Sequence, residues 1–397
     1  MKKQLHAILK QFGLMCIAAS QLLTGAVLIW FVLRVTVGDQ LLFVRVMSYL
    51  LPWLFLGLGV SFLIALLARR RGLAGLTGLL LLPFLYQFGP IFLPKQSVAQ
   101  VDDAACQFRV MSYNVNMNNE NNIKPIAELI RAQSPDILTL QEMVPRVGNP
   151  LQAELQADYP YQLLDDTPGL GRVVMSRYPL QPYSSQLDDE RIQQVLVETP
   201  AGLVMVFNMH PAPAMASGWV EQHRVFQEVA QVISETDKPI LLLGDFNSTP
   251  FSQNYYLIDN LLTDVHAEVG QGFAMTFPNF KRAITQNRSW ITRLVLSMPP
   301  LAHIDHIFVS EQFHPLNIKL LPETAGSDHY PLVAEVALDG CENHRMEDGA
   351  IRYCHPSLPA NLRQGCLRSQ PGSGADVVFR SAKLALHARQ EHSLSYE

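Results

Sequence analysis

A glycine, an aspartate, a phenylalanine and an asparagine follow one another at Gly244–Asn247, directly after the apolar run Pro239–Leu243. The run is typical of a buried strand, so the strand would end by presenting a carboxylate and an amide side by side. A carboxylate can take a proton from water and an amide can hold a phosphoryl oxygen, which suits phosphate ester hydrolysis. An Asp-Asn turn is also common loop chemistry, so the rest of the chain must decide.

Six more polar residues lie at the end of, within or just before other strand-like segments. They are Asn114, Glu142, His210, Asp305, Asp328 and His329. Each alone has an ordinary interpretation as a turn cap, a surface histidine or a buried hydrogen-bonding acid. Their recurrence in one region favours a shared active site.

The residue types favour one kind of reaction. Carboxylates and amides supply the hard oxygen ligands that Mg²⁺ prefers, and Mg²⁺ usually keeps several waters. A zinc site is less expected because the chain has no cysteine cluster and no His-Glu-x-x-His motif. Neither a Gly-x-Ser-x-Gly elbow nor a glycine-rich phosphate loop is present, so serine esterase and P-loop chemistry lack support.

The elements that carry these residues alternate between strand and helix patterns. Apolar residues at helical spacing over Ile123–Ile130 and Phe226–Ile233 predict two amphipathic helices. Two strand segments separated by Pro200–Gly202 predict an antiparallel hairpin, and therefore a mixed sheet in an α/β fold. The predicted strands are Phe108–Val115, Ile137–Leu140, Val173–Met175, Val195–Val197, Leu203–Asn208, Ile240–Leu243, Ile304–Val309 and Leu332–Val336.

The motifs taken in order resemble the endonuclease/exonuclease/phosphatase superfamily over about residues 107–338. They are Ser112-Tyr113-Asn114, Leu140-Gln141-Glu142, Asn208-Met209-His210, Gly244-Asp245-Phe246-Asn247, Ile304-Asp305-His306-Ile307 and Ser327-Asp328-His329. The superfamily includes deoxyribonucleases, abasic-site endonucleases, inositol-polyphosphate 5-phosphatases and neutral sphingomyelinases. The resemblance implies a four-layered α/β sandwich of two mixed sheets flanked by helices. The layout is most similar to the membrane-anchored bacterial branch.

The resemblance also implies a metal site. Glu142 would be the main Mg²⁺ ligand, with Asn114 beside it and Asp328 near the metal. Manganese is the expected substitute.

The remaining roles concern water and phosphate. Asp245 would position or deprotonate the attacking water, and Asn247 would hold a phosphoryl oxygen. His329, oriented by Asp305, would donate to the phosphate, because a histidine paired with an aspartate is held in one tautomer and stabilised as a cation. His210 would act from the opposite side of the phosphate.

Basic residues near the motifs are candidates for substrate binding. Arg172, next to the predicted strand Val173–Met175, could reach the phosphate, and Arg282, in a basic cluster before Asp305, could grip an anionic head group. Ordinary surface positions are the alternative for both.

Three stretches without any charged residue or histidine precede the domain: Met15–Leu33, Met47–Ala68 and Gly72–Leu93. Each is close to the roughly 20 residues that cross a hydrocarbon core, so we expect three transmembrane helices. Basic residues before the first stretch and at Arg69–Arg71 predict a cytoplasmic N-terminus, which places the domain outside the cytoplasm, as in the periplasm of a bacterium. The expected layout is an anchor (1–94), a linker (95–106), a catalytic domain (107–340) and a partly disordered tail (341–397).

Four of the five cysteines fall in the exported part. An even number in an oxidising compartment permits two disulfides. We favour Cys106–Cys341 and Cys354–Cys366, with four free thiols as the alternative.

Charge bears on the substrate. Residues 101–340 contain 14 Lys and Arg against 28 Asp and Glu, a poor composition for tight binding of nucleic acid. The sequence therefore predicts a membrane-anchored, magnesium-dependent phosphodiesterase or phosphatase acting on a lipid head group or small phosphoester. A nuclease outside the cytoplasm is one alternative, and a catalytically silent membrane-anchored binding module is another. The sequence indicates no protein partner.

Overall fold

The computed structural model describes residues 2–93, 95, 106–165, 171–183, 191–214, 218–280 and 298–339. The tail at 341–397 and nearly all of the predicted linker lie outside these ranges. Residues Met1–Gly340 form one compact unit, which is described here by itself.

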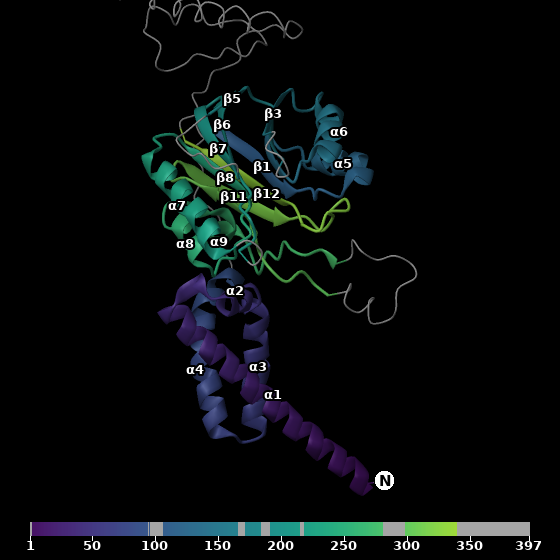
Figure 1. Cartoon of the computed structure of the whole chain (residues 1–397), viewed down its shortest axis with the longest axis vertical. Helices are drawn as coiled ribbons and strands as arrows, with labels where there is room; N and C mark the ends of the chain where they lie inside the picture. The colour runs from purple at the N-terminus through teal and green to yellow at the C-terminus, as the bar shows by residue number, and fades with distance from the viewer. Residues whose placement is uncertain are drawn as a thin grey trace, which may run out of the picture. The chain divides into compact units, whose positions relative to one another are not determined.

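Two mixed six-stranded sheets form the part of the chain that follows the apolar helices (Figure 1). The first has the order β11-β12-β1-β2-β4-β3, and the second has the order β5-β6-β7-β8-β10-β9. The strands of the first are β1 (Cys106–Asn114), β2 (Ile137–Gln141), β3 (Tyr161–Asp165), β4 (Arg172–Ser176), β11 (Phe313–Leu320) and β12 (Leu332–Leu338). Those of the second are β5 (Leu180–Pro182), β6 (Ile192–Thr199), β7 (Gly202–Met209), β8 (Ile240–Asp245), β9 (Thr263–Asp264) and β10 (Asp305–Val309).

The sheets pack face to face, and helices cover their outer faces. Val110 and Ile137 of the first sheet meet Leu241 and Ile307 of the second in one buried apolar cluster. Helices α5 (Ile123–Gln133) and α6 (Pro145–Leu155) pack on the outside of the first sheet. Helices α7 (Trp219–Glu235) and α8 (Gln253–Asp259) pack on the outside of the second, and α9 (Val265–Val269) lies against β10 and β11. The predicted four-layered sandwich is therefore confirmed.

The local patterns read from the sequence also hold. Helix α5 buries Ile126, Ala127 and Ile130, and α7 buries Phe226 and Val229 among others, so both amphipathic helices are confirmed. The predicted hairpin is confirmed as β6–β7, which closes where Thr199 pairs with Gly202. Gly202 has φ +114°, a conformation that favours glycine at such a turn.

Each sheet contains one parallel pair, β1–β2 and β7–β8. Asn114 pairs with Gln141 at the carboxyl end of the first pair, and Met209 pairs with Gly244 at the carboxyl end of the second. Carboxyl ends of parallel strands are where open sheets hold ligands. Glu142 comes directly after β2, and His210 comes directly after β7. Asn247 lies two residues after the end of β8.

Apolar helices precede the sandwich. α1 (Lys2–Thr36) and α4 (Arg71–Phe88), which continues into a 3₁₀ turn at Gly89–Phe92, are long and apolar enough to cross a membrane. The middle predicted span is instead a pair, α2 (Leu42–Tyr49) and α3 (Leu51–Leu67), bent by 76°. Pro52 lies in the first turn of α3, where its missing N–H is tolerated, so a new helix starts there. Two helices, or three if the bent pair is one span, suggest membrane anchoring.

Candidate active site

Two aspartates face each other where β8 ends and β10 begins. Asp305 lies directly opposite Asp245 in the antiparallel pairing, and both side chains are almost fully buried. Gly244 permits the tight packing just before Asp245, because a Cβ there would lie 2.0 Å from the carbonyl oxygen of Met209. Two buried carboxylates this close repel each other unless a proton or a cation lies between them.

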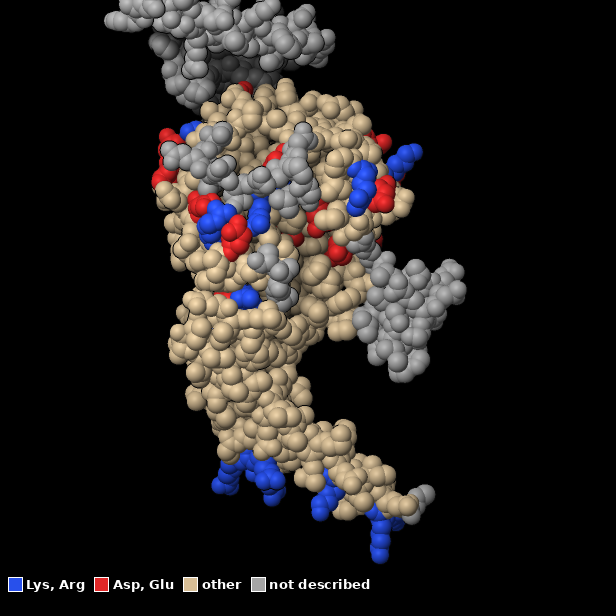
Figure 2. All heavy atoms as spheres, in the orientation of Figure 1, with Lys and Arg blue, Asp and Glu red and all other residues tan. Residues whose placement is uncertain are grey.

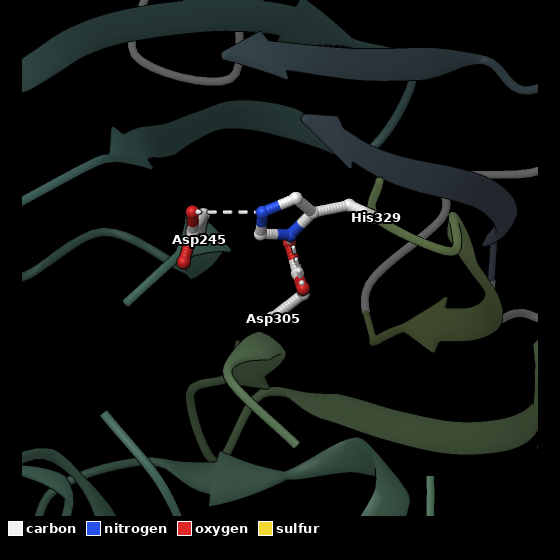
Figure 3. A group of neighbouring side chains, drawn as sticks. All are labelled: Asp245, Asp305 and His329. Carbon is white, nitrogen blue, oxygen red and sulfur yellow. Dashed lines mark hydrogen bonds and ion pairs between the residues drawn. The ribbon is translucent and has the colours of Figure 1, made fainter. Parts of the chain in front are cut away.

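The imidazole of His329 lies between these two carboxylates (Figure 3). Its Nδ1 is 2.9 Å from Asp305 Oδ2, and its Nε2 is 3.7 Å from Asp245 Oδ2. The ring of Phe277 packs against the imidazole, with 4.7 Å between the ring centroids. Ligand atoms of the three polar residues lie within 4.8 Å of one another, so the cluster is also a candidate metal site.

The charges of the cluster follow from this geometry. Burial lowers the pKa of His329, but the negative charges of Asp305 and Asp245 outweigh it and raise this pKa to about 10. Burial raises the pKa of Asp245 to about 7 even though the His329 cation acts in the opposite direction. At neutral pH the histidine is therefore protonated, and both of its ring nitrogens are hydrogen-bond donors.

The Asn114 amide joins the cluster to the other sheet. Its Nδ2 lies 3.1 Å from Glu142 Oε1 and 3.1 Å from Asp245 Oδ2. Glu142 follows β2 directly and has φ +59°, an uncommon left-handed conformation for this residue type. Its second oxygen accepts a hydrogen bond from the Met117 N–H at 2.7 Å. Glu142 as a whole is partly exposed.

Asp328 belongs to the same hydrogen-bonded chain. Its Oδ1 accepts from Asn116 Nδ2 at 2.7 Å, while the Asn116 N–H donates to Asn114 Oδ1 at 3.0 Å. Asn116 also has a left-handed backbone, with φ +65°. Hydrogen bonds thus link the three residues predicted to bind metal at the carboxyl ends of β1 and β2. These residues are Asn114, Glu142 and Asp328.

The turn after β8 is held from several sides. Asn247 has φ +47°, and its N–H donates to Asp245 Oδ1 at 2.9 Å. Its side-chain Nδ2 donates to the Pro211 carbonyl at 3.0 Å. The same Nδ2 also donates to Asp245 Oδ2 at 3.5 Å, so the Asn247 amide lies beside the Asp245 carboxylate.

His210 Nε2 lies 3.6 Å from Asp245 Oδ2. Burial, followed by the charge of Arg172, lowers the pKa of His210 to about 3. The histidine is therefore neutral at physiological pH, and its contact with Asp245 is not an ion pair.

The candidates outside the cluster have different outcomes. Arg172 is fully buried rather than on the surface, and it forms an ion pair with Asp165, opposite it in the β3–β4 pairing. Arg282 lies outside the described residues. Cys106 is disulfide-bonded, but Cys341, Cys354 and Cys366 lie outside the described ranges, so the pairing stays a prediction.

Sequence reasoning overlooked three residues that hold the site. Asn116 was visible only as a second asparagine two positions after Asn114. Asn208 belongs to a motif but had no assigned role; its amide donates to the Leu140 and Val173 carbonyls of the opposite sheet at 3.1 and 3.2 Å. Tyr49, in an apolar helix 198 positions away, donates a hydrogen bond to the Asn247 carbonyl, and no local signal identifies it.

Comparison with known proteins gives the following matches. The family model described as "Endonuclease/Exonuclease/phosphatase family" matches residues 111–329. A family protein from Bacteroides vulgatus is 19% identical, with a TM-score of 0.47, covering 59% of this chain and 100% of that one. A family protein from Bacteroides thetaiotaomicron is 19% identical, with a TM-score of 0.44, and the match covers 59% of this chain and 99% of that one. Truncated TDP2 from Caenorhabditis elegans is 17% identical, with a TM-score of 0.43, and the match covers 58% of this chain and 97% of that one. No match was found among curated proteins.

Proposed function

Because the chain belongs to the endonuclease/exonuclease/phosphatase family, we propose that it is a membrane-anchored, magnesium-dependent phosphoester hydrolase. The observation that carries the proposal is the buried cluster of Asp245, His329 and Asp305, to which Asn114 joins Glu142 from the other sheet. It combines a carboxylate with a pKa near neutrality, a cationic donor and a separate group of oxygen ligands. Members of the family are typically metal-dependent phosphoesterases.

The metal fits one set of residues better than the other. The Asp245–Asp305–His329 cluster is compact enough for an ion, but a protonated His329 has no lone pair to offer a metal. Glu142, Asn114 and Asp328 provide oxygen atoms only, as Mg²⁺ prefers, and Mn²⁺ can use the same atoms. We therefore assign the metal to this second set. The bound ion would supply positive charge to the phosphate.

The chain's own residues then act on water and phosphate. Asp245, when ionised, accepts a proton from the attacking water. The Asn247 amide, which lies beside Asp245, and the His329 cation donate to phosphoryl oxygens, while Asp305 keeps His329 charged and oriented. Neutral His210, whose Nε2 lies 3.6 Å from Asp245 Oδ2, contributes from the opposite side of the phosphate. In-line attack needs little covalent chemistry from the protein, so these positioning and electrostatic effects suffice.

A lipid head group or a small phosphoester is the proposed substrate class, in preference to nucleic acid. The net charge of residues 101–340 is about −14, which opposes the approach of a polyanion. The apolar helices approach the site closely, since Tyr49 of α2 contacts Asn247 directly. A phosphoester at the membrane surface is therefore near the catalytic turn.

The proposed location is outside the cytoplasm. Figure 2 shows basic side chains gathered at the ends of the apolar helices that point away from the sheets. The sequence identifies them as those near the N-terminus and at Arg69–Arg71 between α3 and α4. The positive-inside rule puts that end in the cytoplasm and the catalytic domain on the other side.

The test uses the full-length protein in detergent with bis-nitrophenyl phosphate. We expect hydrolysis that requires Mg²⁺ or Mn²⁺ and that falls by at least ~10²-fold in Asp245→Asn, the usual effect of losing a general base. Asp237→Asn, which alters an exposed carboxylate, is the matched control. Equal turnover by Asp245→Asn and the parent would refute the mechanism.

Substrate class is tested by comparing plasmid DNA, sphingomyelin and phosphoinositides in mixed micelles. Turnover of a lipid phosphoester without plasmid nicking supports the proposed class. Rapid nicking without lipid turnover would establish a nuclease instead, and Mg²⁺ binding without any turnover would favour the silent binding module.

A further inference from the structure

A cavity of about 210 Å³ lies between the apolar helices and the catalytic domain. The helices contribute Tyr49, Pro52, Phe88 and Ile91, and the domain contributes two segments, Thr249–Phe251 and Gly272–Met275 among others. Asp245, Asp305 and His329 do not line it, so the cavity is separate from the catalytic cluster. In Figure 1, α8 and α9 are the domain helices beside α2 and the adjoining ends of α3 and α4.

Aromatic rings form much of its wall. Phe88 of α4 makes edge-to-face contacts with Phe251 and Phe273 of the domain, at centroid distances of 4.9 and 5.1 Å. The volume exceeds the roughly 150 Å³ of an apolar protein cavity that stays dry and binds benzene. Lys95, Asp259 and Asp264 also line the cavity, but most of its wall is apolar, which favours an occupant with an apolar body.

Two buried polar atoms in the lining residues have no hydrogen-bond partner within the described part of the chain. They are Thr249 Oγ and His303 Nε2, on side chains 2% and 9% exposed. Leaving such buried atoms without a partner is unfavourable. An occupant with an apolar body and oxygen atoms at one end could supply partners for these atoms.

The surroundings identify the source of such a molecule. Leu85, Tyr86, Phe92 and Leu93, at the same end of α4, are 52–85% exposed and form an apolar surface next to the cavity-lining Phe88 and Ile91. In a membrane-anchored protein this surface meets lipid.

We propose that the cavity binds one acyl chain of a membrane phospholipid, with the ester oxygens of the lipid facing Thr249 and His303. The inference does not depend on the proposed hydrolase activity. A bound lipid would hold the domain segment after Asn247 against the anchor, and it need not be a substrate.

Photo-cross-linking tests the site in the full chain. The protein is reconstituted into vesicles of phosphatidylethanolamine and phosphatidylglycerol that contain a phosphatidylethanolamine with a diazirine in its acyl chain. Cross-links are expected in the domain peptides that contain Thr249–Phe251 and Gly272–Met275, which lipid around the helices does not reach. Labelling confined to α1, α3 and α4 would overturn the proposal.

Three variants sharpen the result. Ala274→Phe fills the cavity from a buried position and should abolish domain labelling, whereas Leu82→Phe, on an exposed face of α4, should leave it unchanged. Thr249→Val removes a hydroxyl with little change in volume. The variant should need a roughly fivefold higher fraction of the diazirine lipid for half-maximal labelling. A change of this size corresponds to the loss of one neutral hydrogen bond. If the Ala274→Phe variant folds and its domain is labelled as in the parent, the proposed lipid site is wrong. If Ala274→Phe does not fold, parent-like labelling of the Thr249→Val variant has the same meaning.

Discussion

The hydroxyl of Tyr49 in α2 donates a hydrogen bond to the backbone carbonyl of Asn247, two residues beyond Asp245. Gln222 Nε2 donates to the same carbonyl at 3.0 Å. Because Asn247 has a left-handed backbone, outside the regions that most residues prefer, these two donors help to hold it in place. The apolar helices that we propose as the anchor therefore help to shape the turn that carries Asn247.

Other hydrogen bonds also join the apolar helices to the domain. Arg34 Nη2 donates to the Phe251 carbonyl at 3.1 Å, and Trp53 Nε1 donates to the Leu301 carbonyl at 3.2 Å. Asp39 accepts from the N–H of Gln253, whose own side-chain oxygen accepts from the Asp39 N–H. The beginning of α8 is thus held by the anchor, directly after the turn that carries Asn247.

Tyr49→Phe should lower kcat about fivefold and leave KM for a small substrate nearly unchanged. The variant removes one neutral hydrogen bond to a turn that stays held by Gln222, and such a bond contributes about 1 kcal/mol. Steady-state kinetics with bis-nitrophenyl phosphate in detergent measure the effect. Tyr86→Phe, an 85% exposed position on α4, is the control. Unchanged kcat in Tyr49→Phe would show that the anchor does not position the turn.

The pH–rate profile should be bell-shaped, with limbs near pH 7 and pH 10. In the proposed mechanism Asp245 acts only when ionised, so activity should rise as pH passes its pKa of about 7. His329 is proposed to act as a cation, so activity should fall as pH passes its pKa of about 10. Macroscopic values from the profile report the coupled pair rather than either residue alone.

Asp305→Asn should move both limbs of this profile to lower pH. The negative charge of Asp305 raises the pKa of His329 and also raises that of Asp245, so its removal lowers both. A purely structural defect would reduce the rate at every pH without moving the limbs. Asp237→Asn, at an exposed carboxylate, should retain the parent profile.

Removal of metal should abolish activity, and Glu142 should determine how much metal is needed for recovery. After treatment with a chelator, Mg²⁺ or Mn²⁺ should restore the parent, whereas Glu142→Gln should need at least about tenfold more metal because one ligand charge is lost. Glu323→Gln, on an exposed loop, serves as the control. A parent-like metal requirement in Glu142→Gln would place the ion elsewhere, with the Asp245–Asp305–His329 cluster as the next candidate.

The sequence predicted the strands that are buried on both faces, and with them the site residues at their ends. β2 and β8 are apolar, short and fully buried, so the positions of Glu142 and Asp245 followed from local pattern alone. That Asp305 lies opposite Asp245 depends on the register between β8 and β10, which is set by packing across the sheet. The resemblance implied that Asp305 would stabilise a cationic His329, but the pairing of the two aspartates required the structure.

Features that depend on long-range contacts were not predictable in the same way. β3 and β5 are edge strands, and β11 is also an edge with a half-exposed pattern, so their apolar signal was weak. Uncharged composition indicated a continuous span over Met47–Ala68, but a proline near the start of α3 divides it from α2. The bend places Tyr49 at the domain, a contact that no periodicity encodes.

Asn208→Ala should destabilise the catalytic domain by about 3 kcal/mol, because it removes a tie between the two sheets. The Asn208 amide is fully buried in β7, donates to two carbonyls of the opposite sheet and accepts from Gln141 Nε2 at 2.8 Å. Truncation leaves these buried groups without partners, and each such loss costs about 1–3 kcal/mol. Thermal unfolding of the full-length protein in detergent, in the presence and absence of Mg²⁺, provides the measurement. Asn317→Ala, on the exposed face of β11, should change stability by no more than about 0.5 kcal/mol. If both variants unfold at the temperature of the parent, the hydrogen bonds across the sandwich do not stabilise it, and apolar packing between the sheets is sufficient.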